Sequence, residues 1–270
     1  MALNKEIWVS DIKNQLLPDN SFVTKGTDYS AFADNHEIHI PVELGGVNVE
    51  IDRKVLPGQV TATSDNEASI FMHNFTTDPV RVYRPEDIEL SYDKRAVIVK
   101  KIADSVNGKI ASCALGAIRA AGIYGKLSGA NAKVLSEVRD IALQFDQQDY
   151  PDADRYMLLS ADTYSKLLKE LTDSQANAFL SVANAETGVL GKLFGINILK
   201  RSSLNPEYIV APDAPDSDAE ANPDYLAWHK RDYMFALGKT EVYTQENAPE
   251  YYGTVISASV RFGAFGNGQF

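Results

Sequence analysis

Apolar residues recur at every third or fourth position over one long interval of this sequence. They stand at Ile98, Ile102, Val106, Ile110, Ala114, Ala117 and Ala121. This period is that of an amphipathic α-helix, and the acidic pair that follows Pro85 suits the approach to a helix N-terminus. At a rise of about 1.5 Å per residue, a helix over residues 91–121 would be about 45 Å long. That length exceeds what a compact domain of this size needs, so the sequence predicts a spine helix.

The segment before this helix has the pattern of β-structure. Apolar and polar residues alternate through residues 36–51, and Gly45-Gly46 in their middle suits the two-residue turn of a β-hairpin. A polar stretch at 61–67 leads to a second extended segment at 70–84. The pattern therefore predicts long β-ribbons with a polar, protruding tip.

Residues 1–35 hold only short apolar pieces, Ile7–Val9 and Leu16–Leu17, separated by turn-forming residues. Such a segment buries little apolar surface by itself. We expect it to form an arm that lies on another surface, either the body of the protein or a neighbouring molecule.

Helices and strands follow the spine helix without regular alternation, which indicates an α+β fold. Helical periodicity predicts helices at 130–145 and 161–171, the second with Ser160 as its N-cap. Short strands are predicted at 155–159, 194–199, 208–210, 233–237, 241–243 and 251–265, with a break at Gly238. The last strand returns late in the chain to complete a sheet, so the domain begun by the spine helix is expected to be discontinuous.

Candidate chemical groups are few and favour structural roles. Cys113 is the only cysteine and lies among alanines, which is typical of a small buried position. His36 and His39 are three residues apart on a predicted strand and so face opposite sides, which disfavours a shared metal ion and favours solvent-facing or interface positions. His73 and His229 have no patterned partners and are interpreted as structural.

Two loops resemble binding motifs only superficially. Residues 122–129 are glycine-rich but lack the spacing of a phosphate-binding loop, so a helix-ending turn is favoured. The acidic loop at 213–220 lacks the spacing and the glycine of an EF-hand, which favours a solvated loop over a calcium site. We therefore assign no catalytic, cofactor-binding or metal-binding residue, and no cofactor.

Charge and hydropathy limit the partners and the compartment. The formal net charge of −11 disfavours a dedicated nucleic-acid reader. The sequence has no run of 18 apolar residues and its N-terminus has no secretory pattern, so we expect a protein that is made in a cytosol and enters no membrane.

Three local phrases and the order of the elements carry a resemblance to a known family. The phrases are Asp154–Ser160 followed by a helix, Gly191–Ile198, and the final return strand in Gly238–Gly263. Together with an arm, a long ribbon and a spine helix, they resemble the major capsid protein of tailed, double-stranded DNA bacteriophages, whose fold is named after phage HK ninety-seven. The resemblance covers nearly the whole chain.

The resemblance implies a division of the chain into five parts. These are an N-terminal arm (1–35), an extended β loop (36–85), a peripheral domain with the spine helix (86–152), an axial domain (153–245) and a C-terminal strand that returns to the peripheral domain (246–270). It also implies a structural protein, without enzymatic activity, that assembles into an icosahedral shell enclosing the phage genome.

The partners that the resemblance implies are copies of the chain itself, arranged as pentamers and hexamers. A separate scaffolding protein, a portal and decoration proteins would join them, and packaged double-stranded DNA would be contacted non-specifically. The protein would be made in the cytoplasm of the host bacterium and reside in the virion capsid. Candidate interface residues are Trp8, Leu16 and Phe22 in the arm and Thr63, Asp65 and Glu67 near the ribbon tip. Deletion of residues 1–35 is expected to leave a folded subunit that cannot close a shell.

Two alternative functions stay open at this point. An encapsulin-like compartment shell resembles the same fold but encloses a cargo enzyme in place of DNA. A cytosolic α+β enzyme is the alternative from a different class, and it would need a compact group of ionisable residues that the sequence does not offer.

Overall fold

The computed structural model describes residues 11–12, 15–18, 20–33, 36–44, 64–83, 94–127, 133–205, 223–248, 250 and 253–268 of the chain. The α-helices are α3 (Lys94–Ala121), α4 (Val134–Gln147), α5 (Ala161–Glu170) and α6 (Asp173–Leu180), and the short 3-10 helices are η1 (Phe22–Thr24) and η2 (Ser30–Phe32). The strands are β1 (Thr27–Asp28), β2 (Glu37–Leu44), β3 (Ser64–Phe71), β4 (His73–Thr76), β5 (Val80–Tyr83), β6 (Ile123–Gly125), β7 (Arg155–Ser160), β8 (Gly191–Leu193), β9 (Ile196–Arg201), β10 (Tyr225–His229), β11 (Tyr233–Ala248) and β12 (Gly253–Gly266). They form two larger sheets and a two-stranded ribbon.

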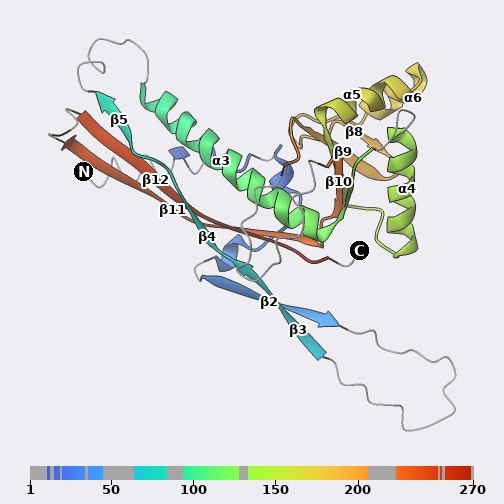
Figure 1. The fold of residues 1–270 in the computed structure, drawn as a ribbon, viewed down its shortest axis with the longest axis horizontal. Coiled ribbons are helices and arrows are strands. Elements are labelled where there is room, and N and C mark those ends of the chain that lie inside the picture. Colours follow the sequence, from blue (N-terminus) through green and yellow to red (C-terminus); the bar gives the residue numbers. More distant parts are fainter. Residues whose placement is uncertain are drawn as a thin grey trace, which may run out of the picture.

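The first sheet is built on the long antiparallel pair β11–β12. Its strand order is β1-β11-β12-β4, and β5 also pairs with β12. Helix α3 lies along one face of this sheet (Figure 1), where its Ile110 and Leu115 belong to the same core as Val260 and Phe262 of β12. The predicted spine helix is thus present, with 28 residues, because its apolar repeat has a long apolar sheet face to cover.

The second sheet lies at one end of the molecule and has the order β6-β10-β7-β9-β8. Helices α4, α5 and α6 gather at this end (Figure 1), and their apolar side chains form a second core with the sheet. On the other face of the sheet, Leu158, Leu226 and Trp228 belong to the core around α3. The predicted N-cap is confirmed, since the Ser160 hydroxyl accepts from the Thr163 amide at 3.2 Å. Helix α6 was not predicted.

The ribbon of β2 and β3 differs from the predicted hairpin. Strand β2 pairs antiparallel with β3 along its whole length, from Glu37 opposite Phe71 to Leu44 opposite Ser64. The predicted two-residue turn at Gly45-Gly46 lies outside the described residues. The pairing of β2 with β3 was not predicted, because alternation marks an extended strand but does not select its partner. Strands β4 and β5 pair with β12, so residues 73–83 lie in the first sheet and not in the ribbon.

Strand β11 is also longer than predicted. The sequence indicated a break at Gly238, but the strand runs for 16 residues and absorbs the irregularity as a register shift between Leu237 and Thr240. The chain changes sheet at residues 230–232, between β10 and β11. Residues 233–245, which were expected in the axial domain, accordingly lie in the first sheet.

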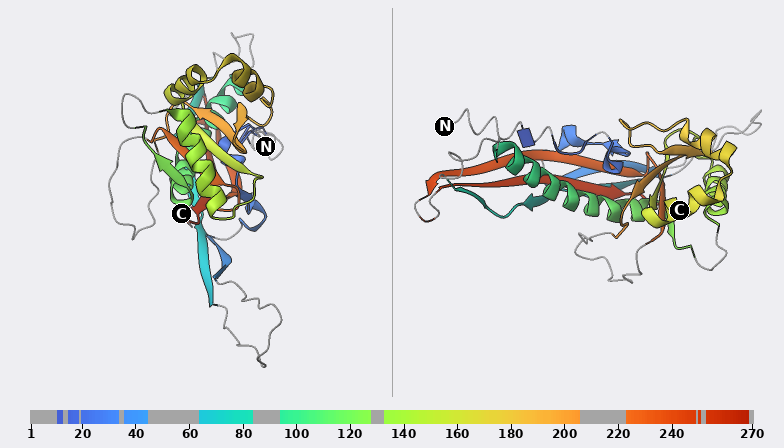
Figure 2. Two further views of the ribbon diagram at one scale, coloured as in Figure 1. Left: turned by 90° about the vertical axis from the view of Figure 1, so that its right-hand side faces the viewer. Right: turned by 90° about the horizontal axis from the view of Figure 1, so that it is seen from above.

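The ribbon projects from the body of the molecule in two perpendicular views (Figures 1 and 2). Its base contacts the rest of the chain through a core of its own, in which Ile38 and Ile70 pack with Met234 and Ala236 of β11. Because side chains alternate along a strand, Met234 and Ala236 lie on the face opposite Tyr233 and Phe235, which belong to the core around α3. The ribbon thus leaves the sheet on the face that α3 does not cover.

Candidate assembly surfaces

The described part of the arm is attached to the chain's own body. Ile12, Leu16 and Phe22 are buried in the core that contains α3. The arm is also held by polar contacts, since Asn107 of α3 donates its side-chain amide to the Gln15 carbonyl at 2.9 Å and Trp228 donates its indole N–H to the Lys25 carbonyl at 3.0 Å. The arm was expected to lie either on the body of the protein or on a neighbouring molecule, and its described residues lie on the body of the protein.

The six candidate interface residues have different positions. Leu16 and Phe22 are only 6% and 8% exposed, so most of their apolar surface is already covered within one chain. Asp65 and Glu67 lie in β3, opposite Glu43 and Pro41, and therefore on the shaft of the ribbon. Trp8 and Thr63 lie outside the described residues.

Close packing fixes the base of the ribbon on the first sheet. A Cβ atom added at Gly263 of β12 would lie 2.6 Å from the carbonyl oxygen of Phe71, so this glycine permits the close approach of β3. His36 contributes two further contacts: its carbonyl accepts from the Met72 amide at 2.9 Å, and its ring nitrogen lies 3.3 Å from the Arg261 guanidinium. The direction in which the ribbon projects is thus set by the body of the subunit.

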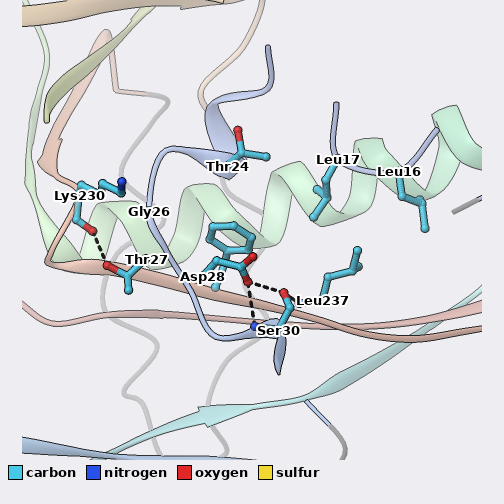
Figure 3. A pocket seen from close by; sticks show the side chains of 10 residues that line it. Leu16, Leu17, Thr24, Gly26, Thr27, Asp28, Ser30, Lys230 and Leu237 are labelled. Carbon is cyan, nitrogen blue, oxygen red and sulfur yellow. Dashed lines mark hydrogen bonds between the residues drawn. The ribbon is translucent and has the colours of Figure 1, made fainter. Parts of the chain in front are cut away.

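A pocket between the arm and β11 has no catalytic constellation (Figure 3). Leu16, Leu17 and Leu237 supply apolar walls, and the side chains of Thr27, Asp28 and Ser30 take part in hydrogen bonds within the pocket. The Thr27 hydroxyl donates to the Lys230 carbonyl at 3.2 Å, and both the amide and the hydroxyl of Ser30 donate to Asp28. The Ser30 hydroxyl oxygen also accepts from the Leu237 amide at 2.9 Å. We therefore interpret the pocket as part of the contact between the arm and the first sheet.

Ionisable side chains gather where the two sheets meet. This junction cluster consists of Tyr150, Arg155, His229 and Asp232, all of which are buried. Arg155 donates to Asp146 at 2.7 Å and to the carbonyl of Pro151 at 2.9 Å. The Tyr150 and His229 rings lie 5.3 Å apart. Such packing ties the loop after α4 to the turn between β10 and β11.

Burial shifts the pKa values of two groups in this cluster. It raises the pKa of the Asp232 carboxyl to about 6. The nearby Tyr150 hydroxyl and Arg231 guanidinium lower this pKa, but by less than burial raises it. It also lowers the pKa of His229, whose ring nitrogen lies 3.1 Å from the Ala153 carbonyl. Asp232 is only 1% exposed, so a substrate cannot reach it. We interpret the cluster as a structural joint.

The remaining candidate groups are a cysteine in the core and a histidine on the ribbon. Cys113 is buried in the core around α3, and burial raises the pKa of its thiol to about 11, which disfavours the reactive thiolate. His39 is exposed and lies 3.2 Å from the Ser69 hydroxyl. No group of three or more His, Cys, Asp or Glu side chains within the described part of the chain could hold a metal ion. Among the helices of the described residues, none has the length and apolarity needed to cross a membrane.

Comparison with solved structures defines the class of fold. The described architecture is similar to that of chains in phage and GTA capsids, which confirms the predicted fold class. A chain in the capsid of a native GTA particle matches with a TM-score of 0.64 at 11% identity, covering 94% of this chain and 88% of that one. A capsid chain of Ralstonia phage GP4 matches with a TM-score of 0.60 at 10% identity, covering 92% and 84%.

The capsid structure of the cyanophage P-SCSP1u shares more sequence. It matches at 19% identity with a TM-score of 0.57, covering 90% of this chain and 83% of that one. No family model and no curated protein sequence matches the chain. The similarity is thus one of fold, carried by architecture and not by a short motif.

Proposed function

We propose that this chain is a major capsid protein of a tailed, double-stranded DNA bacteriophage. Its function would be to assemble with copies of itself into an icosahedral shell around the phage genome. The observation that carries the proposal is the extent of the structural similarity, because the matches to capsid chains extend over 90–94% of this chain. A shared domain inside an unrelated protein would not give matches of that extent.

The shape of the subunit supports assembly as its function. The ribbon buries Ile38, Ile40 and Ile70 at its base, and it projects away from the body (Figure 1). A projecting two-stranded ribbon is marginally stable by itself in water. Contacts with neighbouring subunits would stabilise it, and many copies of a weak contact hold a closed shell together.

The alternatives have less support. The matches reported above are phage and GTA capsids, which favours a genome-enclosing shell over an encapsulin-like compartment. An enzyme would need convergent ionisable groups that a substrate can reach. The junction cluster is buried, and Thr27, Asp28 and Ser30 in the pocket beside the arm are hydrogen-bonded to groups of the same pocket, so a non-enzymatic role is favoured.

The proposal extends to the partners and the location of the protein. The related GTA capsid was determined with C5 symmetry, and we propose pentamers and hexamers for this chain. A separate scaffolding protein, a portal, decoration proteins and non-specifically contacted DNA complete the proposed assembly. The protein would be made in the cytoplasm of the host bacterium and function in the virion capsid.

Size-exclusion chromatography with light scattering tests the proposal on the purified protein. We expect rings of about five or six times the 29.7 kDa subunit mass, or much larger particles, in the presence of a co-expressed scaffolding protein. A protein that stays at 29.7 kDa under every condition, with and without the scaffolding protein, would contradict the proposed function.

A further inference from the structure

Within the described part of the chain, one edge of the long strand β11 is open over most of its length. On one side β11 pairs with β12 from Tyr233 to Ala248. On the other side its one partner among the described strands is β1, at Met234 and Phe235. Beyond Leu237, none of the residues that the structure describes forms a strand against this edge.

The hydrogen bonds of β12 show which amides of β11 face this open edge. Ala258 donates its amide to the Thr77 hydroxyl and accepts from the Thr77 amide, both at 2.9 Å, so its backbone groups point away from β11. In an antiparallel pair, opposite residues either exchange both hydrogen bonds or neither. Val242 lies opposite Ala258, so its amide and carbonyl point to the open edge.

Successive residues of β11 direct their backbone groups alternately to the open edge and to β12, and the register with β12 is uninterrupted between Thr240 and Gln245. Thr244 therefore also presents its amide and carbonyl to the open edge, whereas Tyr243 and Gln245 direct theirs to β12. The same rule holds before the register shift, where the Phe235 carbonyl accepts from the Tyr29 amide at 2.8 Å and the Leu237 amide donates to Ser30 at 2.9 Å. Two independent sets of contacts thus agree on the orientation.

A register shift between Leu237 and Thr240 precedes the stretch from Thr240 to Gln245, but within that stretch the pairing with β12 is regular and the edge has no bulge. Free edges are commonly short, interrupted by proline or guarded by a lysine. Residues 240–245 read Thr-Glu-Val-Tyr-Thr-Gln, which favours β-structure and contains no proline. The charge of the neighbouring Lys239 is already compensated, because its ammonium lies 2.6 Å from Glu241 on the same strand. Tyr243 is 51% exposed beside the edge.

We propose that the open edge of β11 is an assembly surface, on which a strand from a second copy of this chain continues the first sheet. The proposal rests on the proposed function, since only an assembling subunit brings a second copy to this edge. The chain also offers a complementary surface, because neither outer edge of the eight-residue strands β2 and β3 pairs with any other described strand. Two unlike open edges on one chain suit the heterologous contact from which closed rings are built.

A proline scan along β11 tests the proposal. Thr244→Pro removes an amide that faces the open edge and fills its place with the proline ring, which an edge strand tolerates on its outer side. We expect the variant subunit to keep the melting temperature of the wild type within a few degrees and to lose at least tenfold in the yield of assembled particles. Gln245→Pro is the matched control: it removes an amide that faces β12 and should lower the melting temperature of the subunit itself.

Amide hydrogen exchange of the wild-type protein supplies a second test that does not depend on the folding of a variant. In the unassembled subunit, the amides of Val242 and Thr244 should exchange much faster than those of Tyr243 and Gln245, and in assembled particles all four should be protected. Equal protection of the four amides in the unassembled subunit would mean that one chain covers its own edge, and would overturn the proposal.

The outcomes separate this inference from the function on which it rests. Normal particles formed by a folded Thr244→Pro variant would overturn the role of the edge and leave the capsid function intact. A wild-type protein that never assembles would contradict the capsid function itself.

Discussion

Asn107, in the middle of the spine helix, holds the arm of the chain by accepting the backbone amide of Leu17 at 3.1 Å. Its side-chain amide donates in turn to the Gln15 carbonyl at 2.9 Å, so one side chain satisfies two backbone groups of the arm. Asn107→Ala removes both bonds and leaves the Leu17 amide without its partner. We expect a loss of about 1–2 kcal/mol in the free energy of unfolding, measured by chemical denaturation, with faster proteolysis of the arm.

Ser112→Ala on the same helix is the control for this substitution, because the Ser112 hydroxyl bonds only to the Gly108 carbonyl within α3. It should change the free energy of unfolding by less than about 0.5 kcal/mol. Equal stabilities of the Asn107→Ala and Ser112→Ala variants would show that these two hydrogen bonds contribute little to the stability of the protein.

Deletion of residues 1–35 should unfold the subunit. Ile12, Leu16, Phe22 and Val23 are buried in the core around α3, and each buried side chain of this kind contributes about 1.5–3 kcal/mol. Their combined loss is comparable to the whole stability of a typical domain, about 5–15 kcal/mol. The sequence alone led us to expect a folded subunit that cannot close a shell. From the structure we expect instead an unfolded protein, which would show a loss of near-UV circular dichroism and of solubility. Deletion of residues 1–10 alone retains these core side chains and is the control.

The base of the ribbon can be tested at a single glycine. In Gly263→Ala the added methyl group would lie 2.6 Å from the backbone oxygen of Phe71, so β3 must shift away from β12. Overpacking of this kind costs about 1–3 kcal/mol, which should appear as a lower melting temperature. Gly108→Ala is the opposite control: nothing lies near the added Cβ in this helix, and we expect stabilisation by about 0.5–1 kcal/mol. A Gly263→Ala variant as stable as the wild type would mean that the ribbon is not anchored at this point.

The buried carboxyl of Asp232 predicts a pH dependence of stability. Burial raises its pKa to about 6 from an ordinary value of 3.8, so the folded state binds the proton more tightly than the unfolded state does. The destabilising effect of the charge is therefore complete above pH 6 and disappears as the pH falls towards 4. Asp232→Asn should stabilise the protein at pH 7.5 by up to about 3 kcal/mol, and this gain should vanish near pH 4.

Denaturant unfolding of both proteins between pH 4 and pH 8 measures this difference. Asp140→Asn, at an exposed carboxyl of α4, is the control and should shift stability by less than about 0.5 kcal/mol at every pH. A constant difference between Asp232→Asn and the wild type across this range would show that Asp232 does not titrate as described.

Local signals in the sequence were sufficient for α3, α4 and α5, but α6 was missed. The spine helix and the Ser160 cap follow from a repeat and a capping residue that lie within a few positions of one another. Strand pairing depends on residues that are far apart in the sequence. Leu44 pairs with Ser64, and the alternating pattern gave no indication that the partner strand begins 20 residues later. The break expected at Gly238 was a register shift, because β12 supplies a continuous partner on both sides of it.

The assembly surfaces were only partly predictable. The apolar residues of the arm were recognised, but the position of Leu16 and Phe22 against their own spine helix depends on the folded core. The open edge of β11 was not singled out, although the proline-free stretch from Thr240 to Gln245 carried a signal. A strand is an edge strand when no other strand pairs with one of its sides, and which strands pair is known only from the folded sheet.

Electron microscopy of the purified protein, co-expressed with a scaffolding protein, distinguishes a shell-forming capsid protein from a monomer. We expect closed particles of uniform diameter with icosahedral symmetry, whose subunits show the spine helix and the projecting ribbon in averaged maps. Monomeric protein without rings, sheets or shells under every condition would contradict the claim that this chain is a capsid subunit.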